Sequence, residues 1–299
     1  MSVARPMPHG PAQWPLPETG LEAPRLVRFW QRLPHRFHRT LLLDYDGTLA
    51  PFRAQRDEAV PFPGVRELLD AIIADRGCRL VVVSGRAIDD LIPLLGLQAA
   101  PEIWGSHGLE RLHADGRRQR ARLSARVRQG LEEAWLLAQA VGWPERCETK
   151  PGCVAWHWRG LSPAEARAPL ARIHDAWTGI ATRYGLALHP FDGGLELRTR
   201  HGNKGDAVRA VRRESGVHGI AAYLGDDLTD EDAFAALGDG DLGLLVRPQV
   251  RPSRAGVWLR PPEELLAFLA HWRALCAAGP CISQGGLHAP DRSRPHPSA

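Results

Sequence analysis

The sequence lacks the features that mark membrane, secreted and nucleic-acid-binding proteins. No stretch approaches the roughly 18 to 20 consecutive apolar residues of a membrane helix, and the Pro-rich start has no apolar run of signal-peptide type. The net charge is only +4 and no long basic run occurs. The five cysteines, at 78, 147, 153, 276 and 281, form no CxxC pair, which disfavours structural zinc and disulfides. We therefore expect a cytoplasmic monomer without nucleic-acid or membrane partners.

Lysine and asparagine are almost absent. Lys and Arg together number 38, yet the only lysines are Lys150 and Lys204, and Asn203 is the only asparagine. A codon bias toward G and C would replace lysine with arginine wherever either serves. The two lysines are then either chance survivors or positions that need a compact ammonium, which a planar guanidinium cannot replace.

The composition itself is that of a globular protein. The chain has 299 residues, 44% of them apolar and 24% charged, enough for one large or two modest domains. Residues 1–22 and 279–299 are aperiodic and rich in Pro, Gly or Ser, which predicts disordered tails.

Apolar runs that end in polar turns alternate with helical stretches. The runs TLLLDYDG (40–47), CRLVVVSGR (78–86) and IAAYLGDD (220–227) are typical of buried strands, and shorter runs cover 242–246 and 256–259. Helical patterns lie between them. The alternation predicts an α/β fold with a Rossmann-like parallel sheet over 23–108 and 198–278, where ligands bind beyond the carboxyl ends of the strands.

Residues 109–197 have a different rhythm, which predicts a small inserted α+β lobe. A helix over 124–142 precedes a hairpin that turns at Pro151-Gly152, and a second helix starts at Ser162-Pro163 and runs toward Tyr184. Pro169 predicts a kink or a late start in that helix. A second hairpin turns through 192–194. This order suits an antiparallel sheet with two helices on one face.

Acidic residues follow two of the predicted strands. Asp44 and Asp46 come directly after the first, and an acidic segment with Asp226, Asp227 and Asp230 follows the third. Such residues are often only turn formers, and an EF-hand loop is excluded because its later acidic positions are absent. If both segments meet at the edge of the sheet, their repulsion requires a cation, and oxygen ligands favour Mg²⁺.

Phosphate-binding groups are also placed at strand and helix ends. Ser84 and Gly85 end a buried strand, where a hydroxyl and free N–H groups can hold oxygens. Lys204 stands just before a helix, so an anion there meets both a charge and a helix start. Each feature alone is commonplace. Together and in this order, the Asp44 and Asp46 pair, Ser84-Gly85, Lys204 and the acidic segment after the third strand indicate a phosphoryl-transfer site.

These segments resemble a known superfamily. DYDGTL, VVVSGR, Lys204 and GDDLTDED are similar to the four motifs of the haloacid dehalogenase superfamily of phosphatases, over residues 39–269. GSHGLE, ETKPGCVAWHWR, GGLELR and HGNKGDAV further resemble the trehalose-6-phosphate phosphatase family. The resemblance implies Mg²⁺-dependent hydrolysis of trehalose 6-phosphate, the last step of trehalose biosynthesis, and makes the insertion at 109–197 a substrate-selecting cap.

The resemblance also implies roles for individual residues. Asp44 would be the nucleophile and would form an aspartyl-phosphate, with Asp46 as general acid and then general base. The remaining implied roles are phosphate binding by Thr48, Ser84, Gly85 and Lys204, Mg²⁺ binding by Asp44, Asp226 and the Asp46 carbonyl, and ordering of the site by Asp227, Asp230 and Asn203, with Asp230 the next candidate for a metal ligand.

Substrate choice is expected in the cap. Lys150, His157 and Glu196 are implied to bind sugar hydroxyls, with Arg86, His107 and Glu110 as weaker candidates. Trp156 and Trp158 alternate with His157 along the strand, so we expect them to pack on the opposite face. Both lysines then lie in motifs, which favours a functional explanation of their survival.

Three alternatives remain open from the sequence. The enzyme could act on another sugar phosphate, such as sucrose phosphate or glucosylglycerol phosphate. It could bind sugar phosphates without turnover, although a pure binder gains nothing from a nucleophile beside an acid. It could also pass the phosphoryl group to a second sugar instead of water.

Overall fold

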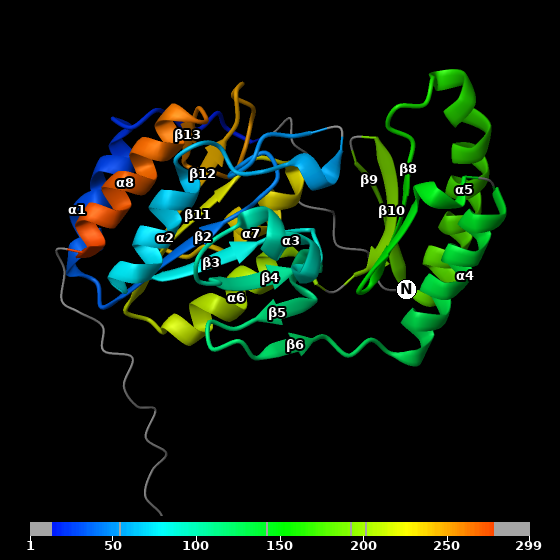
Figure 1. Cartoon of the computed structure of the whole chain (residues 1–299), viewed down its shortest axis with the longest axis horizontal. Coiled ribbons are helices and arrows are strands. Elements are labelled where there is room, and N and C mark those ends of the chain that lie inside the picture. The colour runs from blue at the N-terminus through cyan, green and yellow to red at the C-terminus, as the bar shows by residue number, and fades with distance from the viewer. Residues whose placement is uncertain (1–13, 54, 142, 192, 201, 278–299) are drawn as a thin grey trace, which may run out of the picture.

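The protein has two lobes, each built on its own sheet (Figure 1). The computed structural model describes residues 14–277 except 54, 142, 192 and 201. The central lobe holds a nine-stranded sheet and the second lobe a four-stranded one. Within the described residues, no helix combines the length and the apolar character needed to span a membrane.

The middle of the central sheet is parallel, as predicted. Its order is β1-β13-β12-β11-β2-β3-β4-β5-β6, so the first long strand lies at the centre with a parallel neighbour on each side. Helices lie in the connections from β2 to β3, from β3 to β4 and from β11 to β12, as parallel pairing of consecutive strands requires. The parallel strands are β2 (His38–Leu43), β3 (Arg79–Val83), β4 (Glu102–Gly105), β11 (Gly219–Gly225), β12 (Leu242–Val246) and β13 (Val257–Leu259).

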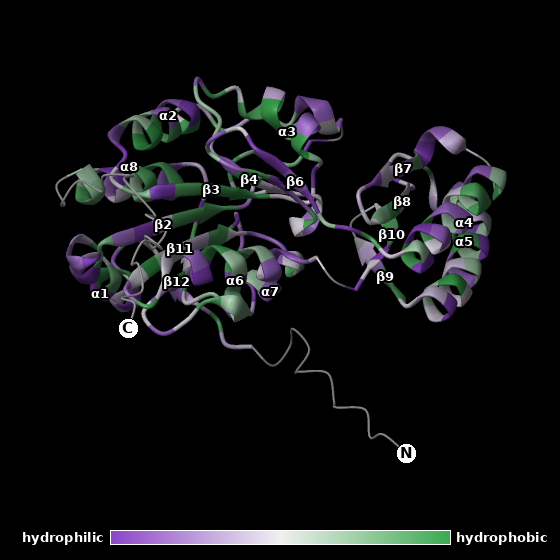
Figure 2. Cartoon of the chain, turned by 90° about the horizontal axis from the view of Figure 1, so that it is seen from below, coloured by the Kyte–Doolittle hydropathy of each residue, from purple (hydrophilic) through white to green (hydrophobic). Residues whose placement is uncertain are grey.

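Helices cover both faces of this sheet (Figure 2). Leu41 and Leu43 belong to one core cluster and Leu42 to another, because successive side chains of a strand point to opposite faces. Both clusters are apolar, which explains why the strands read as continuous hydrophobic runs. The first cluster packs against α1 (Pro24–Arg32), α2 (Val65–Asp75), α3 (Ile88–Leu95) and α8 (Glu263–Ala277), and the second against α6 (Lys204–Ser215) and α7 (Glu231–Ala236).

One edge of the sheet contradicts the prediction of a disordered tail over 1–22. β1 (Glu18–Thr19) pairs in parallel with β13, and the Ser253 amide donates to the Pro15 carbonyl at 3.1 Å. Two paired residues are too short a segment to show periodicity, so the sequence gives no sign of this strand. The other tail residues, 1–13 and 279–299, lie outside the described residues.

The opposite edge corrects the expected start of the insertion. β5 (Glu110–Leu112) and β6 (Arg118–Arg120) pair antiparallel with β4 and with each other, so they extend the central sheet. The boundary expected at residue 109 therefore lies before two strands of the central lobe. Backbone pairing decides this, and the polar sequence of β6 carries no matching signal.

The second lobe has the predicted order of elements. Its antiparallel sheet runs β7-β8-β10-β9, and two helices cover one face of it. Ser162 forms a capping box with Glu165, so the second helix starts at Pro163 and the late start suggested by Pro169 is wrong. Asp192, in the predicted second turn, lies outside the described residues. The elements are α4 (Ala125–Val141), η5 (Pro144–Arg146), β7 (Cys147–Lys150), β8 (Cys153–His157), α5 (Pro163–Tyr184), β9 (Leu186–Phe191) and β10 (Gly194–Thr199).

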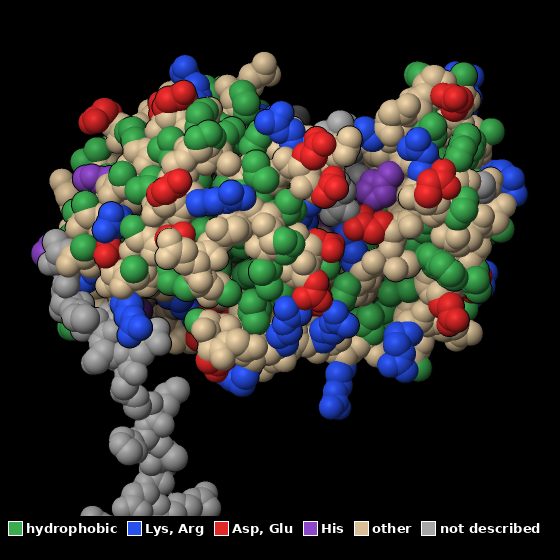
Figure 3. Space-filling model, viewed as in Figure 1, with side chains coloured by type: hydrophobic (Ala, Val, Ile, Leu, Met, Phe, Trp, Pro, Cys, Tyr) green, Lys and Arg blue, Asp and Glu red, His purple; other side chains and the backbone are tan. Residues whose placement is uncertain are grey.

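A hollow separates the two lobes on the face seen in Figure 3, and acidic, basic and histidine side chains gather there. Charged groups seldom cluster without partners or a ligand. The hollow is therefore the first place to search for a functional site.

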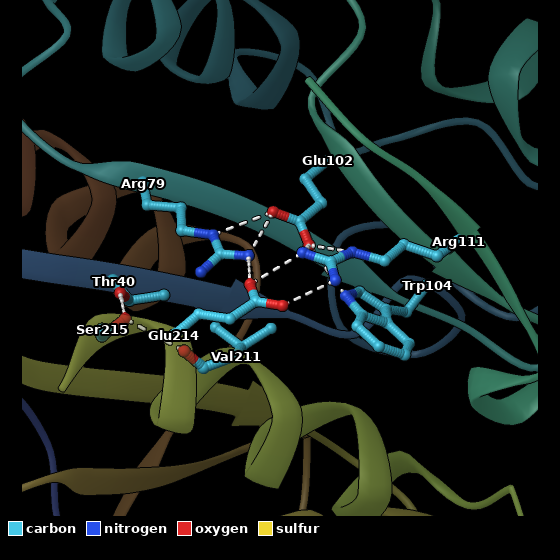
Figure 4. A network of polar contacts seen from close by, with 8 residues as sticks. All are labelled: Thr40, Arg79, Glu102, Trp104, Arg111, Val211, Glu214 and Ser215. Atoms are coloured by element: carbon cyan, nitrogen blue, oxygen red, sulfur yellow. Dashed lines mark hydrogen bonds and ion pairs between the residues drawn. The ribbon is translucent and has the colours of Figure 1, made fainter. Parts of the chain in front are cut away.

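A network of ion pairs joins the antiparallel edge of the central sheet to α6 (Figure 4). Glu102 accepts hydrogen bonds from Arg79 at 2.8 and 2.6 Å, from Arg111 at 2.9 Å and from the Trp104 indole at 2.9 Å. Both arginines also bond Glu214 on α6. The network therefore connects β3, β4 and β5 with the helix that begins at Lys204.

We predict that Glu102→Gln lowers the free energy of unfolding by about 2 kcal/mol, because it leaves two part-buried guanidinium groups with fewer acceptors. Urea unfolding measures this. Glu214→Gln is the matched control: the Glu214 side chain is 42% exposed, so its loss should cost less than about 1 kcal/mol. Equal losses in the two variants would contradict the assignment of Glu102 as the centre of the network.

Candidate active site

The carboxyl ends of three neighbouring strands meet at one end of a pocket of about 1010 Å³. Asp44 follows β2, Gly85 follows β3 and Asp226 follows β11, and all three line the pocket. Residues of the second lobe line its other side, including Lys150 and His157. The hollow in Figure 3 is thus shared by both lobes.

Three buried carboxylates form the acidic centre of the pocket. Ligand atoms of Asp44, Asp226 and Asp230 lie within 4.8 Å of one another. Burial, and then the neighbouring Asp230 carboxylate, raise the pKa of Asp44 to about 7. Burial and the charges of Asp44 and Asp230 raise the pKa of Asp226 well above its usual range. Without a further cation, the cluster resists full ionisation.

Lys204 supplies the one ammonium within this cluster in the described chain. Its Nζ donates to Asp44 Oδ1 at 2.6 Å and to Asp230 Oδ1 at 2.8 Å. Burial alone would lower its pKa, but Asp230 and Asp44 raise that pKa above the usual value, so the side chain stays charged. Three ionised carboxylates and one ammonium leave two negative charges, which matches a divalent cation.

Asn203 places Lys204 at the first position of α6. Its side chain accepts from the Asp206 amide at 2.8 Å, and Asp206 accepts in return from the Asn203 amide at 3.3 Å, which completes a capping box. The helix start is therefore fixed next to Asp44. This capping role explains why the only asparagine of the chain directly precedes one of its two lysines.

Asp230 uses both of its oxygens to order the loop after β11. Oδ1 accepts from Lys204 and from the Tyr223 hydroxyl at 2.6 Å, and Oδ2 accepts from the amides of Asp226 and Asp227 at 3.1 and 3.0 Å. With these donors in place, Asp230 has little capacity left for a metal ion. Its contacts fit a residue that orders the site.

Asp226 has the opposite character. Its Oδ1 is buried and has no hydrogen-bond partner in the described part of the chain. A buried carboxylate oxygen without a donor is costly unless a cation or water satisfies it. Together with Asp44, it offers the hard oxygen ligands that Mg²⁺ prefers, so these residues fit a magnesium ion.

Asp46 is held by Arg86. The guanidinium donates to Asp46 Oδ2 at 2.7 Å and to Oδ1 at 2.6 Å, a bidentate pair that fixes the carboxylate plane. Arg86, expected to bind substrate, is buried against this partner although it also lines the pocket. Sequence reasoning missed the pair, because 40 residues separate the two positions.

Of the other expected phosphate ligands, Thr48 contacts Asp44 and Gly85 lines the pocket, whereas Thr48 and Ser84 are not among its lining residues. The Thr48 hydroxyl donates to Asp44 Oδ2 at 3.3 Å, and Ser84 Oγ accepts from the Arg86 amide at 3.1 Å. Both are buried. Gly85 reaches the pocket, and a Cβ there would come within 2.6 Å of the His107 ring, so this position accepts no larger residue without a shift.

The acidic segment after β11 does not converge as a whole. Glu231, which belongs to the same acidic segment GDDLTDED, accepts from Arg251 at 2.5 Å, from the Ser253 hydroxyl at 2.8 Å and from the Arg254 amide at 2.9 Å. It begins α7 and turns away from the pocket, because consecutive helical residues point in different directions. Asp227 caps η6 (Leu228–Asp230) and also lines the pocket.

The second sheet presents a row of polar residues to the pocket. The register places Glu148, Ala155, Glu196 and His189 side by side on four strands. All but Ala155 line the pocket. His157 Nε2 lies 3.0 Å from Glu148 Oε2, and Lys150 Nζ lies 3.3 Å from that same oxygen. This face combines acceptors and donors as recognition of several hydroxyls requires.

Glu196 lies at the junction of the two lobes. His107, expected as a substrate ligand, is half-buried, and its Nε2 lies 3.7 Å from Glu196 Oε1. The Cys153 thiol donates to the same oxygen at 2.9 Å. Burial opposes ionisation of Glu196, but His107 and the Lys150 charge outweigh it and hold the pKa of Glu196 below its usual range. Burial lowers the pKa of His107, which favours a neutral ring. Glu110, the weaker candidate, pairs with Ser106 and Arg120 instead.

Among the lining residues that sequence reasoning missed are Glu148, His189 and Arg198 of the second sheet. Each stands two residues, or one register step, from a residue that was singled out. The alternation of strands, applied from His157 and Glu196 outward, would have placed them on the same face. That same alternation correctly put Trp156 into the helix-covered core, with Trp158 packed against it.

The comparisons with known proteins agree on one family. Residues 42–254 match the sequence model of the family described as trehalose-phosphatase. The chain is 30% identical over 228 residues to a trehalose-phosphate phosphatase of Mycobacterium marinum, an alignment that covers 72% of this chain and 55% of that protein. The chain thus spans about half the length of this curated relative.

Solved structures share the fold. The C-terminal domain of C. albicans trehalose-6-phosphate phosphatase superposes with a TM-score of 0.71 at 20% identity, covering 88% of this chain and 99% of that one. A haloacid dehalogenase-like hydrolase from B. subtilis gives a TM-score of 0.54 at 15% identity, with 78% and 99% covered. The parallel sheet with its added cap lobe is therefore the haloacid dehalogenase fold that the sequence predicted.

Proposed function

The chain belongs to the trehalose-phosphatase family, and from that premise we propose that it hydrolyses trehalose 6-phosphate to trehalose and phosphate. One observation carries the proposal. A single pocket joins an acidic, lysine-containing site at the strand ends to a polar sheet face suited to sugar hydroxyls. The first part suits a phosphate ester, and the second suits the sugar attached to it.

The first chemical step is displacement at phosphorus. An oxygen of Asp44 attacks, the bond from phosphorus to the sugar oxygen breaks, and a protonated Asp46 donates its proton to the departing oxygen. The product is an aspartyl-phosphate and free sugar. Lys204, already 2.6 Å from Asp44, offers N–H donors to the phosphoryl oxygens as their charge is redistributed.

The second step returns the enzyme to its starting state. Asp46 takes a proton from a water molecule, whose oxygen attacks phosphorus, and the bond to Asp44 breaks to release phosphate. Arg86 holds Asp46 in place for both transfers. Because a protonated carboxyl oxygen no longer accepts as well, uptake of the proton must weaken one of the two contacts with Arg86.

Mg²⁺ would be held by the carboxylates of Asp44 and Asp226 and by the Asp46 carbonyl. When bound, it neutralises charge shared between the nucleophile and the phosphate. Asp226 Oδ1, which has no hydrogen-bond partner among the described residues, and the surplus of negative charge support this assignment. The chain's contribution is to hold these oxygens apart from bulk solvent.

The direct test is phosphate release from trehalose 6-phosphate, glucose 6-phosphate and sucrose 6-phosphate, each with Mg²⁺ and with EDTA. We predict release from trehalose 6-phosphate that EDTA abolishes. Glu148→Gln should raise KM for it by about 10-fold to 100-fold, because Lys150 and His157 then lose the carboxylate that positions them on the pocket face. Glu132→Gln, an exposed change on α4, is the control and should leave KM unchanged.

Other outcomes separate the alternatives. Equal rates on all three sugars would contradict a trehalose-selecting cap, and release that persists in EDTA would contradict the magnesium site. Labelled phosphate recovered on a second sugar would identify a phosphotransferase. Tight binding without any release would leave a sugar-phosphate-binding protein.

A further inference from the structure

Two large apolar side chains stand open on the central-lobe wall of the pocket. Phe52 is 62% exposed and Leu228 is 52% exposed, and both line the pocket. Phe52 lies in the loop that continues from Asp44 and Thr48, and Leu228 begins η6 directly after Asp227. Most other lining residues are charged or polar. Exposed apolar groups inside a pocket mark a contact with a ligand or partner more often than isolated ones elsewhere.

The Phe52 ring is close to the acidic centre. A Cβ built on Gly47 would meet Asp226 Oδ2 at 2.2 Å and Phe52 Cε2 at 2.7 Å. The ring edge and the Asp226 carboxylate are therefore neighbours across Gly47, whose φ of +84° no larger residue adopts easily. The ring therefore borders the acidic centre in which a phosphate ester at Asp44 would lie.

The second lobe offers little apolar surface that could cover these residues on closure. The least polar of its lining residues are Cys147 and Pro190. Glu145, Arg146 and Arg159, which also line the pocket, are charged. Burying an aromatic ring against charged groups would strip those groups of water. A ligand with an apolar face is a better match.

A pyranose ring has such a face. Its C–H groups form apolar patches above and below the ring, while its hydroxyls radiate from the edges. The pocket face of the second sheet, with Glu148, His157 and Glu196, supplies partners for the edges, and Phe52 and Leu228 supply apolar surface on the central-lobe side. We infer that Phe52 is the platform on which the phosphate-bearing sugar ring packs. This inference rests on the proposed function and makes Phe52 a specificity residue.

The test compares Phe52→Ala with Phe37→Ala, a control that removes an equally exposed phenylalanine (69%) that does not line the pocket. Wild type and variants are assayed on the sugar phosphate that the wild type hydrolyses fastest. Phe52→Ala should lower kcat/KM about 10-fold, mainly through KM, and should raise the inhibition constant of the free sugar product by a similar factor. The inhibition constant of inorganic phosphate should stay unchanged. Phe52→Trp should retain most of the activity, and Phe37→Ala should match the wild type.

Several results would overturn the inference. If Phe52→Ala raises the inhibition constant of inorganic phosphate as much as that of the free sugar, the ring acts through the phosphate site or through lobe closure. Unchanged sugar inhibition would also exclude the platform, as would a wild type that hydrolyses no sugar phosphate. Hydrolysis of glucose 6-phosphate but not trehalose 6-phosphate would overturn the proposed function alone, because the comparison then proceeds with glucose 6-phosphate.

Discussion

Replacement of Asp44 with asparagine is expected to lower the rate of phosphate release by about 10⁴-fold or more, because an amide cannot form the aspartyl-phosphate. The fold should persist, since asparagine matches the shape, its one amide oxygen can still accept from Lys204, and its NH2 group can donate to the Thr48 hydroxyl. The control is Asp239→Asn, an exposed change outside the pocket. A variant that keeps more than about a hundredth of the wild-type rate would place the nucleophile elsewhere.

The same variant should change how stability depends on pH. Burial and the Asp230 carboxylate raise the pKa of Asp44 to about 7, whereas the pKa of an aspartate in the unfolded chain is about 4. Because the folded-state pKa is the higher one, the protonated form favours folding, and this contribution is lost as pH rises from about 4 through 7. In EDTA, the stability of wild type should therefore fall more between pH 5 and pH 7.5 than that of Asp44→Asn. Urea unfolding at both pH values measures the difference, and parallel changes would contradict it.

Lys204→Met is expected to abolish activity and to lower the free energy of unfolding by about 3 to 5 kcal/mol. The substitution leaves the buried carboxylates of Asp44 and Asp230 without their shared cation. Removing one partner of a buried ion pair destabilises the fold strongly, because it leaves an uncompensated charge in the interior. Phosphate release and urea unfolding are the measurements. Arg209→Met, which removes an exposed ion pair on the same helix, should cost less than about 1 kcal/mol.

Lys204→Arg tests why lysine survives in a chain so rich in arginine. The Nζ contacts two carboxylate oxygens, at 2.6 and 2.8 Å, within a buried space, and a planar guanidinium needs more room and a different donor geometry. We expect a smaller loss of stability than in Lys204→Met, since charge is kept, but a loss of activity of at least about 10³-fold. An active Lys204→Arg enzyme would mean that the position needs only positive charge.

The sequence predicted the parts of the site that follow local rules. Strands that end in Asp44, Ser84 or Asp226 are recognisable because apolar runs in parallel sheets are continuous and their carboxyl ends meet at one edge. Asn203 and Lys204 were identified by composition and by the helix start that follows them. Trp156 was assigned to the core by strand alternation alone.

The parts that were missed depend on tertiary contacts. The pairing of Asp46 with Arg86 and of Glu231 with Arg251 joins side chains from separate segments, and no spacing rule encodes such a choice. The attachment of β1 and of the β5–β6 hairpin to the central sheet is likewise decided by backbone partners far away in sequence. Short or polar strands carry no periodicity from which this could be read.

The two sides of the pocket are built on two different sheets, and this division affects how such an enzyme can change over generations. The described chain passes between the lobes only after β6 and after β10, and the lobes keep separate hydrophobic cores. Under the proposed function, a mutation in the polar row of the second sheet would alter which leaving group is accepted without disturbing the packing behind Asp44. Selection can explore new substrates on one half while the chemistry of the other is inherited intact, and a chimera that exchanges the second lobe between relatives would be a practical way to transfer specificity.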